Sequence, residues 1–306
     1  MPAITAVGPL PADQLAAVRD AALSRAEQLG CSTTEVRVER HEAEVWARCV
    51  ELAALVPGNP LGAVTDRRGA VPLPALTTVD SSEFNRVGAL GLEAPVTATT
   101  VERIAQFYLD RGQDHFRVEV VPQALSPDLA GILGSVGLHP VPETVTKVWR
   151  CFDARDGAGA AGADDSAHSA DVRLLTSEHA EQVAALNVRA WGAWGAPVSL
   201  GPWFGASVGA EGFAHYGVFV DDRLVCTGAM AISGDLAWIG FDATHPRHQS
   251  QQLRRAVTRR RIGDAVAAGC RVVHAEADSS RLTSRSRLLD THYDRMLFVH
   301  GTARPS

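Results

Sequence analysis

The chain has 306 residues, which is long for one ordinary domain and enough for two domains with separate cores. Hydrophobic residues make up 46% and charged residues 21% of the sequence, a composition typical of a folded globular protein. The formal net charge of −6 provides no long-range attraction to nucleic acid or to anionic membranes, so we expect neither as a main partner.

In the first half, apolar residues recur at helical spacing and predict helices over 11–29, 42–55, 99–111 and 128–136. Thr99 or Thr100 is the expected N-cap of the third helix, and an alternating strand is expected over 115–121. Residues 154–170, ARDGAGAAGADDSAHSA, have the composition of a flexible linker. The linker predicts a division of the chain near its middle.

In the second half, three strands are expected over 216–220, 224–232 and Leu236–Thr244, joined by short turns as an antiparallel meander. Pro246 ends the third strand, a helix over 251–268 ends at Gly269, and a strand over 270–275 follows. A strand, a helix and a returning strand predict a right-handed crossover.

Residues 235–275, DLAWIGFDATHPRHQSQQLRRAVTRRRIGDAVAAGCRVVHA, resemble the acetyl-CoA signature of GNAT N-acetyltransferases. Residues 83–92, EFNRVGALGL, resemble the N-terminal half of tandem GNAT proteins. The resemblance implies an α/β fold of two tandem GNAT-like domains, each a mixed, mostly antiparallel sheet flanked by helices. We expect a degenerate domain over 1–152, a linker over 153–170 and an acyltransferase-like domain over 171–306.

The resemblance also implies acetyl-CoA, or another acyl-CoA, as co-substrate. In the family the loop after the third strand directs backbone N–H groups at a pyrophosphate, where the helix N-terminus favours negative charge. The residues expected to bind the cofactor are Ala243, Thr244, Gln249, Ser250, Gln251, Gln252, Leu253, Arg254 and Arg255. Gln252 and Arg254 replace the family's glycines. The N–H row survives if Gln252 has a helical φ, whereas a positive φ there would be strained.

Arg259, Arg260 and Arg261 follow on the same helix and are expected to form a solvated helix face. Asp242, near the end of the third strand, is the candidate general base, with a solvated strand-end carboxylate as the alternative. His292 and Tyr293 stand where the family often has Gly-Phe, and Tyr293 is either a catalytic acid or a core aromatic.

Trp191, Trp194 and Trp203 lie in AWGAWGAPVSLGPWFGA, which corresponds in the family to the helix and loop over the acceptor site. With Tyr216 they predict an aromatic-walled acceptor pocket, and the alternative is that the indoles simply cover the sheet.

The five cysteines include no CxxC pair, and His245 and His248 lack further ligands at metal-binding spacing, so neither disulfides nor a metal is expected. The N-terminus has no signal-peptide pattern, and we expect a cytoplasmic monomer or homodimer. The resemblance implies direct transfer of an acetyl or other short acyl group to an amine of a small molecule. The alternative is a GNAT-fold protein that no longer uses acetyl-CoA and performs a different reaction or binds a ligand.

Overall fold

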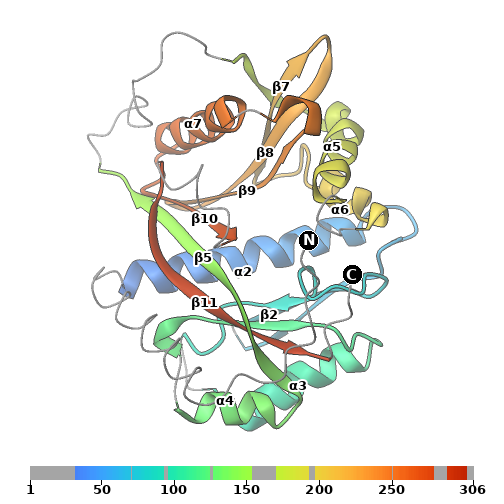
Figure 1. The fold of residues 1–306 in the computed structure, drawn as a ribbon, viewed down its shortest axis with the longest axis vertical. Coiled ribbons are helices and arrows are strands. Elements are labelled where there is room, and N and C mark those ends of the chain that lie inside the picture. The colour runs from blue at the N-terminus through green and yellow to red at the C-terminus, as the bar shows by residue number, and fades with distance from the viewer. Residues whose placement is uncertain are drawn as a thin grey trace. The chain divides into compact units, whose positions relative to one another are not determined.

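The computed structural model describes residues 32–69, 71–92, 96–124, 127–153, 170–192, 197–249, 251–278 and 288–301. The helix predicted over 11–29 and nearly all of the predicted linker lie outside these residues. The chain forms two compact units, the first from Met1–Lys147 with His292–Ser306 and the second from Val148–Thr291 (Figure 1). The predicted domain limits stay a prediction.

The first unit combines helices with a small hairpin and a mixed sheet. Its elements are α2 (Ser32–Ala54), β1 (Ala63–Arg68), β2 (Val71–Leu76), β3 (Arg86–Val87), α3 (Ala98–Leu109), β4 (Arg117–Val120), η1 (Pro122–Ala124), α4 (Pro127–Gly134), most of β5 (Leu138–Cys151) and most of β11 (Asp290–His300). β1 and β2 are antiparallel, β3 is parallel to β4, and β4 is antiparallel to β11.

The helix α3 shows why this unit folds as it does. Its buried residues Val101, Ile104 and Tyr108 share one helical stripe and belong to the same apolar core as Val118 of β4. Thr97 caps the helix by accepting a hydrogen bond from the Thr100 backbone N–H. The predicted caps, Thr99 and Thr100, were therefore wrong by two or three residues, because three threonines in four positions give the same capping signal.

Buried charges hold the last strand to this unit. The guanidinium of Arg295 on β11 lies 2.9 Å from a Glu42 carboxylate oxygen, 2.6 Å from one of Glu119 and 3.4 Å from one of Glu39. Arg295 and these three carboxylates are at most 2% exposed. Nearby cations lower the pKa of Glu119 to about 2 against the opposing effect of its burial. Removing Arg295 would leave carboxylates buried without their main cation, which is costly.

The second unit is an antiparallel meander with a crossover. Its elements are the end of β5, then β6 (Val172–Leu175), η3 (Ser177–His179), α5 (Ala180–Gly192), η4 (Val198–Leu200), α6 (Gly201–Ala206), β7 (Phe213–Val220), β8 (Arg223–Ser233), β9 (Leu236–Thr244), η5 (Pro246–His248), α7 (Gln251–Ala267), β10 (Val272–Asp278) and the start of β11. Strands β6 to β9 pair antiparallel in chain order, and β10 pairs parallel to β9. The predicted meander and crossover are confirmed.

Side chains alternate between the two faces of this sheet. On β7, His215 bonds to Ser207 at the end of α6, whereas its neighbour Tyr216 bonds to Asp264 of α7. The helices α5 and α6 therefore share one face, and α7 covers the other. In the described part of the chain, no helix has the length and hydropathy needed to cross a membrane.

Candidate functional site

A β-bulge interrupts β9 at Phe241 and Asp242, five residues after the strand begins at Leu236. Gly240 pairs with Ala229 and Ala243 pairs with Thr227, so Phe241 and Asp242 lie opposite the single residue Gly228. Phe241 has a φ of 51°, a conformation that costs a bulky residue about 1–3 kcal/mol. A bulge turns backbone groups out of the regular ladder. The backbone of β9 at this point is therefore available to something other than β8.

The neighbouring strand β10 stops pairing with β9 close to the bulge. The pairs between β10 and β9 run from Val272 with Leu236 to His274 with Trp238, and among the described residues they end there. The bulge begins three residues further along β9, at Phe241. In open α/β sheets, ligands bind beyond the carboxyl ends of strands that part in this way. The helix α7 begins seven residues after the end of β9.

Asp242 forms an ion pair across the bulge with Arg261 of α7. Arg261 is 0% exposed and also donates to the carbonyls of Ala229, at 2.8 Å, and Gly240, at 3.1 Å. The absence of a side chain at Gly228 makes room for it, since a Cβ there would lie 2.7 Å from the guanidinium. The guanidinium thus fastens α7 to the bulged strands, and Asp242 is its counterion.

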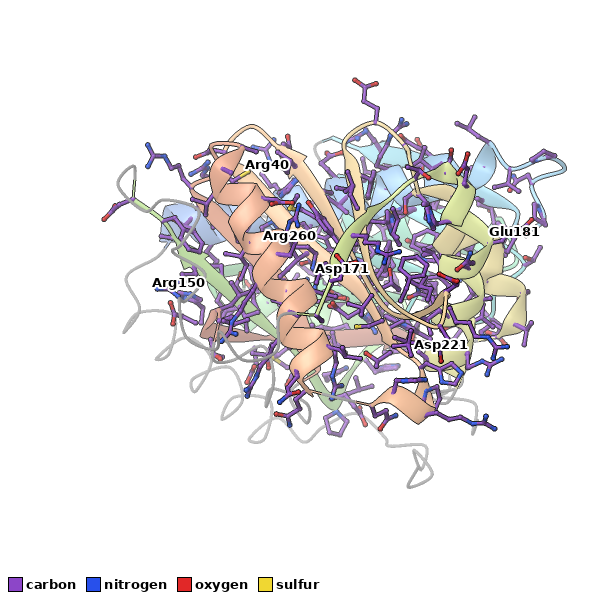
Figure 2. The ribbon with its side chains drawn as sticks, turned by 90° about the horizontal axis from the view of Figure 1, so that it is seen from above. Arg40, Arg150, Asp171, Glu181, Asp221 and Arg260 are labelled. Atoms are coloured by element: carbon purple, nitrogen blue, oxygen red, sulfur yellow. The ribbon has the colours of Figure 1, made fainter. Side chains whose placement is uncertain are left out.

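The prediction that Arg261 belongs to a solvated helix face was wrong. Arg260, its neighbour in the run, is exposed and pairs with Asp264 at 2.9 Å, and Figure 2 shows it on α7 near Asp171. Successive residues of a helix are turned by about 100°, so the three arginines point in different directions, and Arg261 is the one that faces the sheet. The glycine that admits this one lies 33 positions earlier in the sequence.

The start of α7 does not have the backbone strain that a positive φ at Gln252 would cause. Gln252 lies within the helix, is exposed and is not among the residues with positive φ. Arg254 is also exposed, while Leu253 and Arg255 are half-buried and Ser250 lies outside the described residues. The first turn contains no acidic residue. The positive end of the helix dipole is therefore not neutralised by a carboxylate of its own first turn.

His245 ends the loop from β9 and caps η5. The Arg247 backbone N–H donates to its Nδ1 at 3.2 Å, and Arg189 of α5 lies 3.0 Å from its Nε2. The pKa of His245 is below its ordinary value because of desolvation and the positive charge of Arg189, with smaller effects of His248 and Arg247. The imidazole is therefore neutral, and able to accept a proton, over a wider pH range than an ordinary histidine.

Aromatic side chains gather on the α5 and α6 side of the bulge. The ring of Phe241 lies 6.0 Å from Trp203, 5.9 Å from Phe204 and 5.2 Å from Trp238 between centroids. Trp191 joins the cluster through Phe204 at 5.6 Å. Two residues of the predicted pocket, Trp191 and Trp203, thus belong to one cluster at the bulge. The strained bulge residue Phe241 is at its centre, and it was not predicted from the sequence.

The other two predicted pocket residues have different outcomes. Trp194 lies outside the described residues. Tyr216 is on the opposite face of the sheet, where its hydroxyl donates to Asp264 at 3.0 Å. Burial and Asp264 raise the pKa of Tyr216 well above its usual value. Its contacts are those of a residue that packs α7 against the sheet.

Known proteins with a similar structure identify this architecture. A GCN5-related N-acetyltransferase from Kribbella flavida has a TM-score of 0.55 and 15% identity, covering 83% of this chain and 95% of its own. A tandem GNAT protein from the clavulanic acid biosynthesis pathway, without acetyl-CoA, has a TM-score of 0.55 and 17% identity, covering 85% and 94%. A functionally unknown conserved protein from Staphylococcus epidermidis has a TM-score of 0.53 and 10% identity, covering 79% and 95%.

The chain has the fold of a tandem GNAT protein. No protein-family model matches the sequence, and no curated protein matches it. At these identities the likeness concerns the fold alone. The expected α/β class with two GNAT-like halves is confirmed, and the site must be argued from its own residues.

The predicted catalytic residues of this GNAT fold are divided between the two units. Asp242 lies in the second unit, whereas His292 and Tyr293 belong to the first, where both are buried. The Tyr293 hydroxyl donates to Glu39 at 2.7 Å, and burial together with Glu39 raises its pKa well above the usual value. Its role as general acid stays a prediction, as does the role of Asp242 as base.

Proposed function

We propose that the second unit is an acyl-CoA-dependent N-acyltransferase that moves an acetyl or other short acyl group directly to an amine of a small molecule. The observation that carries the proposal is the coincidence, within one unit, of the β9 bulge, the end of β9–β10 pairing and the start of α7. This combination provides unpaired strand backbone beside a positive helix end. Neither feature alone would point to a particular cofactor.

The residues present fit an acyl-CoA, which supplies an acyl group already activated as a thioester. The first turn of α7, Gln251 to Arg255, would hold the diphosphate through backbone N–H groups, and Arg254 and Arg255 add charge. Gln252 fits without strain because its φ is not positive. Backbone N–H groups of Phe241 and Asp242 would polarise the acyl carbonyl, and they need no reorganisation because the bulge fixes them.

The chain supplies two candidates for removing the amine proton. Asp242 is the ion-pair partner of Arg261, and His245 has a lowered pKa on the adjoining loop. The aromatic cluster of Trp191, Trp203 and Phe241 would orient the acceptor beside them. With the acyl donor and acceptor held together, loss of translational freedom contributes a large share of the rate gain, and no covalent enzyme intermediate is required.

Calorimetric titration of the full chain with acetyl-CoA and with CoA tests the proposal. We expect micromolar binding, and a further test is thiol release with a panel of small amines. In Gln252→Gly, affinity should stay within about twofold of the wild type, because the exposed helical Gln252 leaves the N–H groups accessible. The double variant Arg254→Gln/Arg255→Gln should bind about tenfold more weakly.

Absence of heat and of any thermal shift with either ligand would refute acyl-CoA binding. That result would favour the alternative, a GNAT-fold protein with another ligand or reaction, to which the replacement of both loop glycines by Gln252 and Arg254 also points. The cytoplasmic location, the small-molecule acceptor and the monomeric or dimeric state remain part of this proposal.

A further inference from the structure

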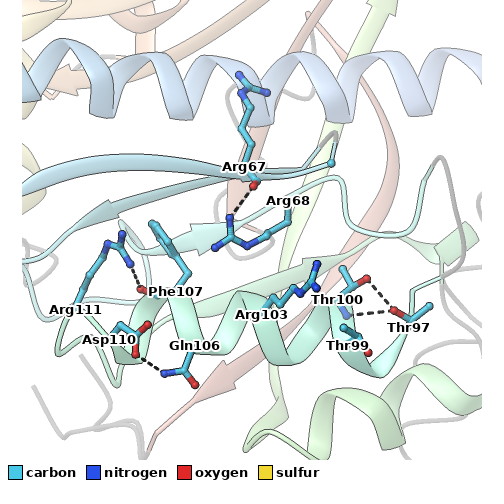
Figure 3. A pocket seen from close by; sticks show the side chains of 11 residues that line it. Arg67, Arg68, Thr97, Thr99, Thr100, Arg103, Gln106, Phe107, Asp110 and Arg111 are labelled. Carbon is cyan, nitrogen blue, oxygen red and sulfur yellow. Dashed lines mark hydrogen bonds between the residues drawn. The ribbon is translucent and has the colours of Figure 1, made fainter.

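A groove lies in the first unit, between the β1–β2 hairpin and α3. Its volume is about 840 Å³, within the range of small-molecule sites, and four arginines line it: Arg67, Arg68, Arg103 and Arg111. Asp110 is the one acidic residue in the lining, and it accepts a hydrogen bond from Gln106. In Figure 3, Arg68 from the hairpin and Arg103 from α3 extend into the same space. The lining therefore carries a clear excess of positive charge.

The four arginines differ in how many of their guanidinium N–H groups already have partners within the protein. Arg67 is engaged with Glu44 through two hydrogen bonds of 2.7 and 2.5 Å, and it points away from the groove toward α2 in Figure 3. Arg68 bonds to Asp66 at 2.5 Å and to the Arg67 carbonyl at 2.9 Å, both through Nη1. The Nε and Nη2 groups of Arg68 remain able to donate to a ligand.

Arg111 and Arg103 are still less engaged. Arg111 lies over the Phe107 ring, 4.1 Å from its centroid, and Nη1 donates to the Phe107 carbonyl at 2.8 Å. Arg103 makes neither a hydrogen bond nor an ion pair with any residue in the described part of the chain. Three guanidinium groups thus keep donors for the groove, and a bound anion would reduce the repulsion among them that Asp66 and Asp110 leave uncompensated.

Polar groups on α3 complete the lining. Thr97, Thr99 and Thr100 lie at the start of the helix, and the first turn contains no acidic residue. The Thr97 and Thr100 hydroxyls are 2.9 Å apart, so one of them keeps its proton for another acceptor. Hydroxyl donors beside guanidinium forks suit an acceptor with several oxygens in more than one direction. Phosphate provides three such oxygens and carboxylate two.

We infer that this groove binds a small molecule with a diphosphate group, held by Arg68, Arg103 and Arg111. One phosphate would meet the Arg103 fork and the threonine hydroxyls at the helix start. The second would meet Arg68 from the hairpin. The diphosphate is either free in solution or attached to a nucleoside, and the same three arginines would recognise both.

The test is calorimetric titration of the full chain with inorganic pyrophosphate and, separately, with ADP at low ionic strength. Arg103→Gln should weaken binding about tenfold or more, because it removes charged hydrogen bonds that nothing else replaces. Arg103 is exposed and has no hydrogen bond or ion pair among the described residues, so the variant should melt at the same temperature as the wild type. The matched control is Arg48→Gln, which changes an exposed arginine of α2 that pairs with Glu51; this variant should bind within about twofold of the wild type.

Diphosphates can also meet the start of α7, and the variant Arg254→Gln/Arg255→Gln separates the two sites. If the groove binds the diphosphate, this variant keeps the signal that Arg103→Gln removes. Absence of heat with both probes in the wild type would overturn the inference. So would equal losses in Arg103→Gln and Arg48→Gln, or a signal lost only in the α7 variant. Tighter binding of citrate than of pyrophosphate would overturn the choice of phosphate.

Discussion

Replacing Asp242 with asparagine tests whether the bulge depends on its ion pair. The change keeps an acceptor oxygen and removes the negative charge beside Arg261, whose guanidinium is 0% exposed. Breaking a buried pair from one side costs about 3–5 kcal/mol, since the remaining charge is buried and uncompensated. The Asp242 side chain is 16% exposed, so water reaches it, and we place the cost near 3 kcal/mol. The expected fall in melting temperature is about 6–12 °C.

Urea unfolding followed by circular dichroism measures this cost, with Asp171→Asn as the control. Asp171 pairs with Arg173 at 2.8 Å, but these side chains are 74% and 56% exposed, so the control should lose less than about 1 kcal/mol. In an Arg261→Met background, Asp242→Asn should also cost less than about 1 kcal/mol, because no buried cation remains. An equal cost in both backgrounds, or a cost below about 1 kcal/mol in the wild type, would refute the reasoning.

Three further predictions concern other parts of the chain. Gly131→Ala in α4 should raise the free energy of unfolding by about 0.5–1 kcal/mol, since a Cβ there meets nothing within 4 Å; a lowered melting temperature would contradict this. His215 has a pKa lowered to about 4 from 6.5 by burial and by Arg261, so only the unfolded chain gains a proton as pH falls from 6.5 toward 4. Stability should drop by about 3 kcal/mol over that range in the wild type but not in His215→Asn, and parallel urea curves for the two proteins would exclude the effect. Tyr293→Phe should lower the free energy of unfolding by about 1–3 kcal/mol, because it removes the hydrogen bond to Glu39, and should leave kcat for acyl transfer unchanged. A large loss of kcat at an unchanged melting temperature would instead assign Tyr293 the role of general acid.

The sequence predicted those parts of the fold that local signals delimit. Strand β9 was predicted with its observed bounds, because a turn precedes Leu236 and Pro246 stops the strand after Thr244. The helix α7 begins at Gln251 as predicted and ends one residue earlier than expected. The hairpin of β1 and β2 was not predicted. Pro72 and Pro74 lie in β2 and, in a sequence, argue against a strand.

The site was harder to predict, because its residues come together through tertiary contacts. The sequence indicated the bulged strand and the start of α7, but not the positive φ of Phe241, which depends on how β8 pairs with it. The burial of Arg261 likewise depends on Gly228, a residue on another element. Trp203 was identified because its sequence neighbourhood resembled the acceptor loop of GNAT proteins; Phe204, in the same stretch, and Trp238, on β9, were not predicted to belong to the pocket.

Arg295 is synthesised after the three carboxylates that it pairs with, which affects when the first unit can fold. The ribosome makes Glu39, Glu42 and Glu119 early, but their shared cation belongs to the last segment, His292–Ser306, which is assigned to the first unit. A nascent first half would therefore have to bury three carboxylates without that cation, so it should remain incompletely folded until His292–Ser306 has been synthesised. A chain truncated before His292 should fail in its first unit, although the sequence it lacks lies at the opposite end.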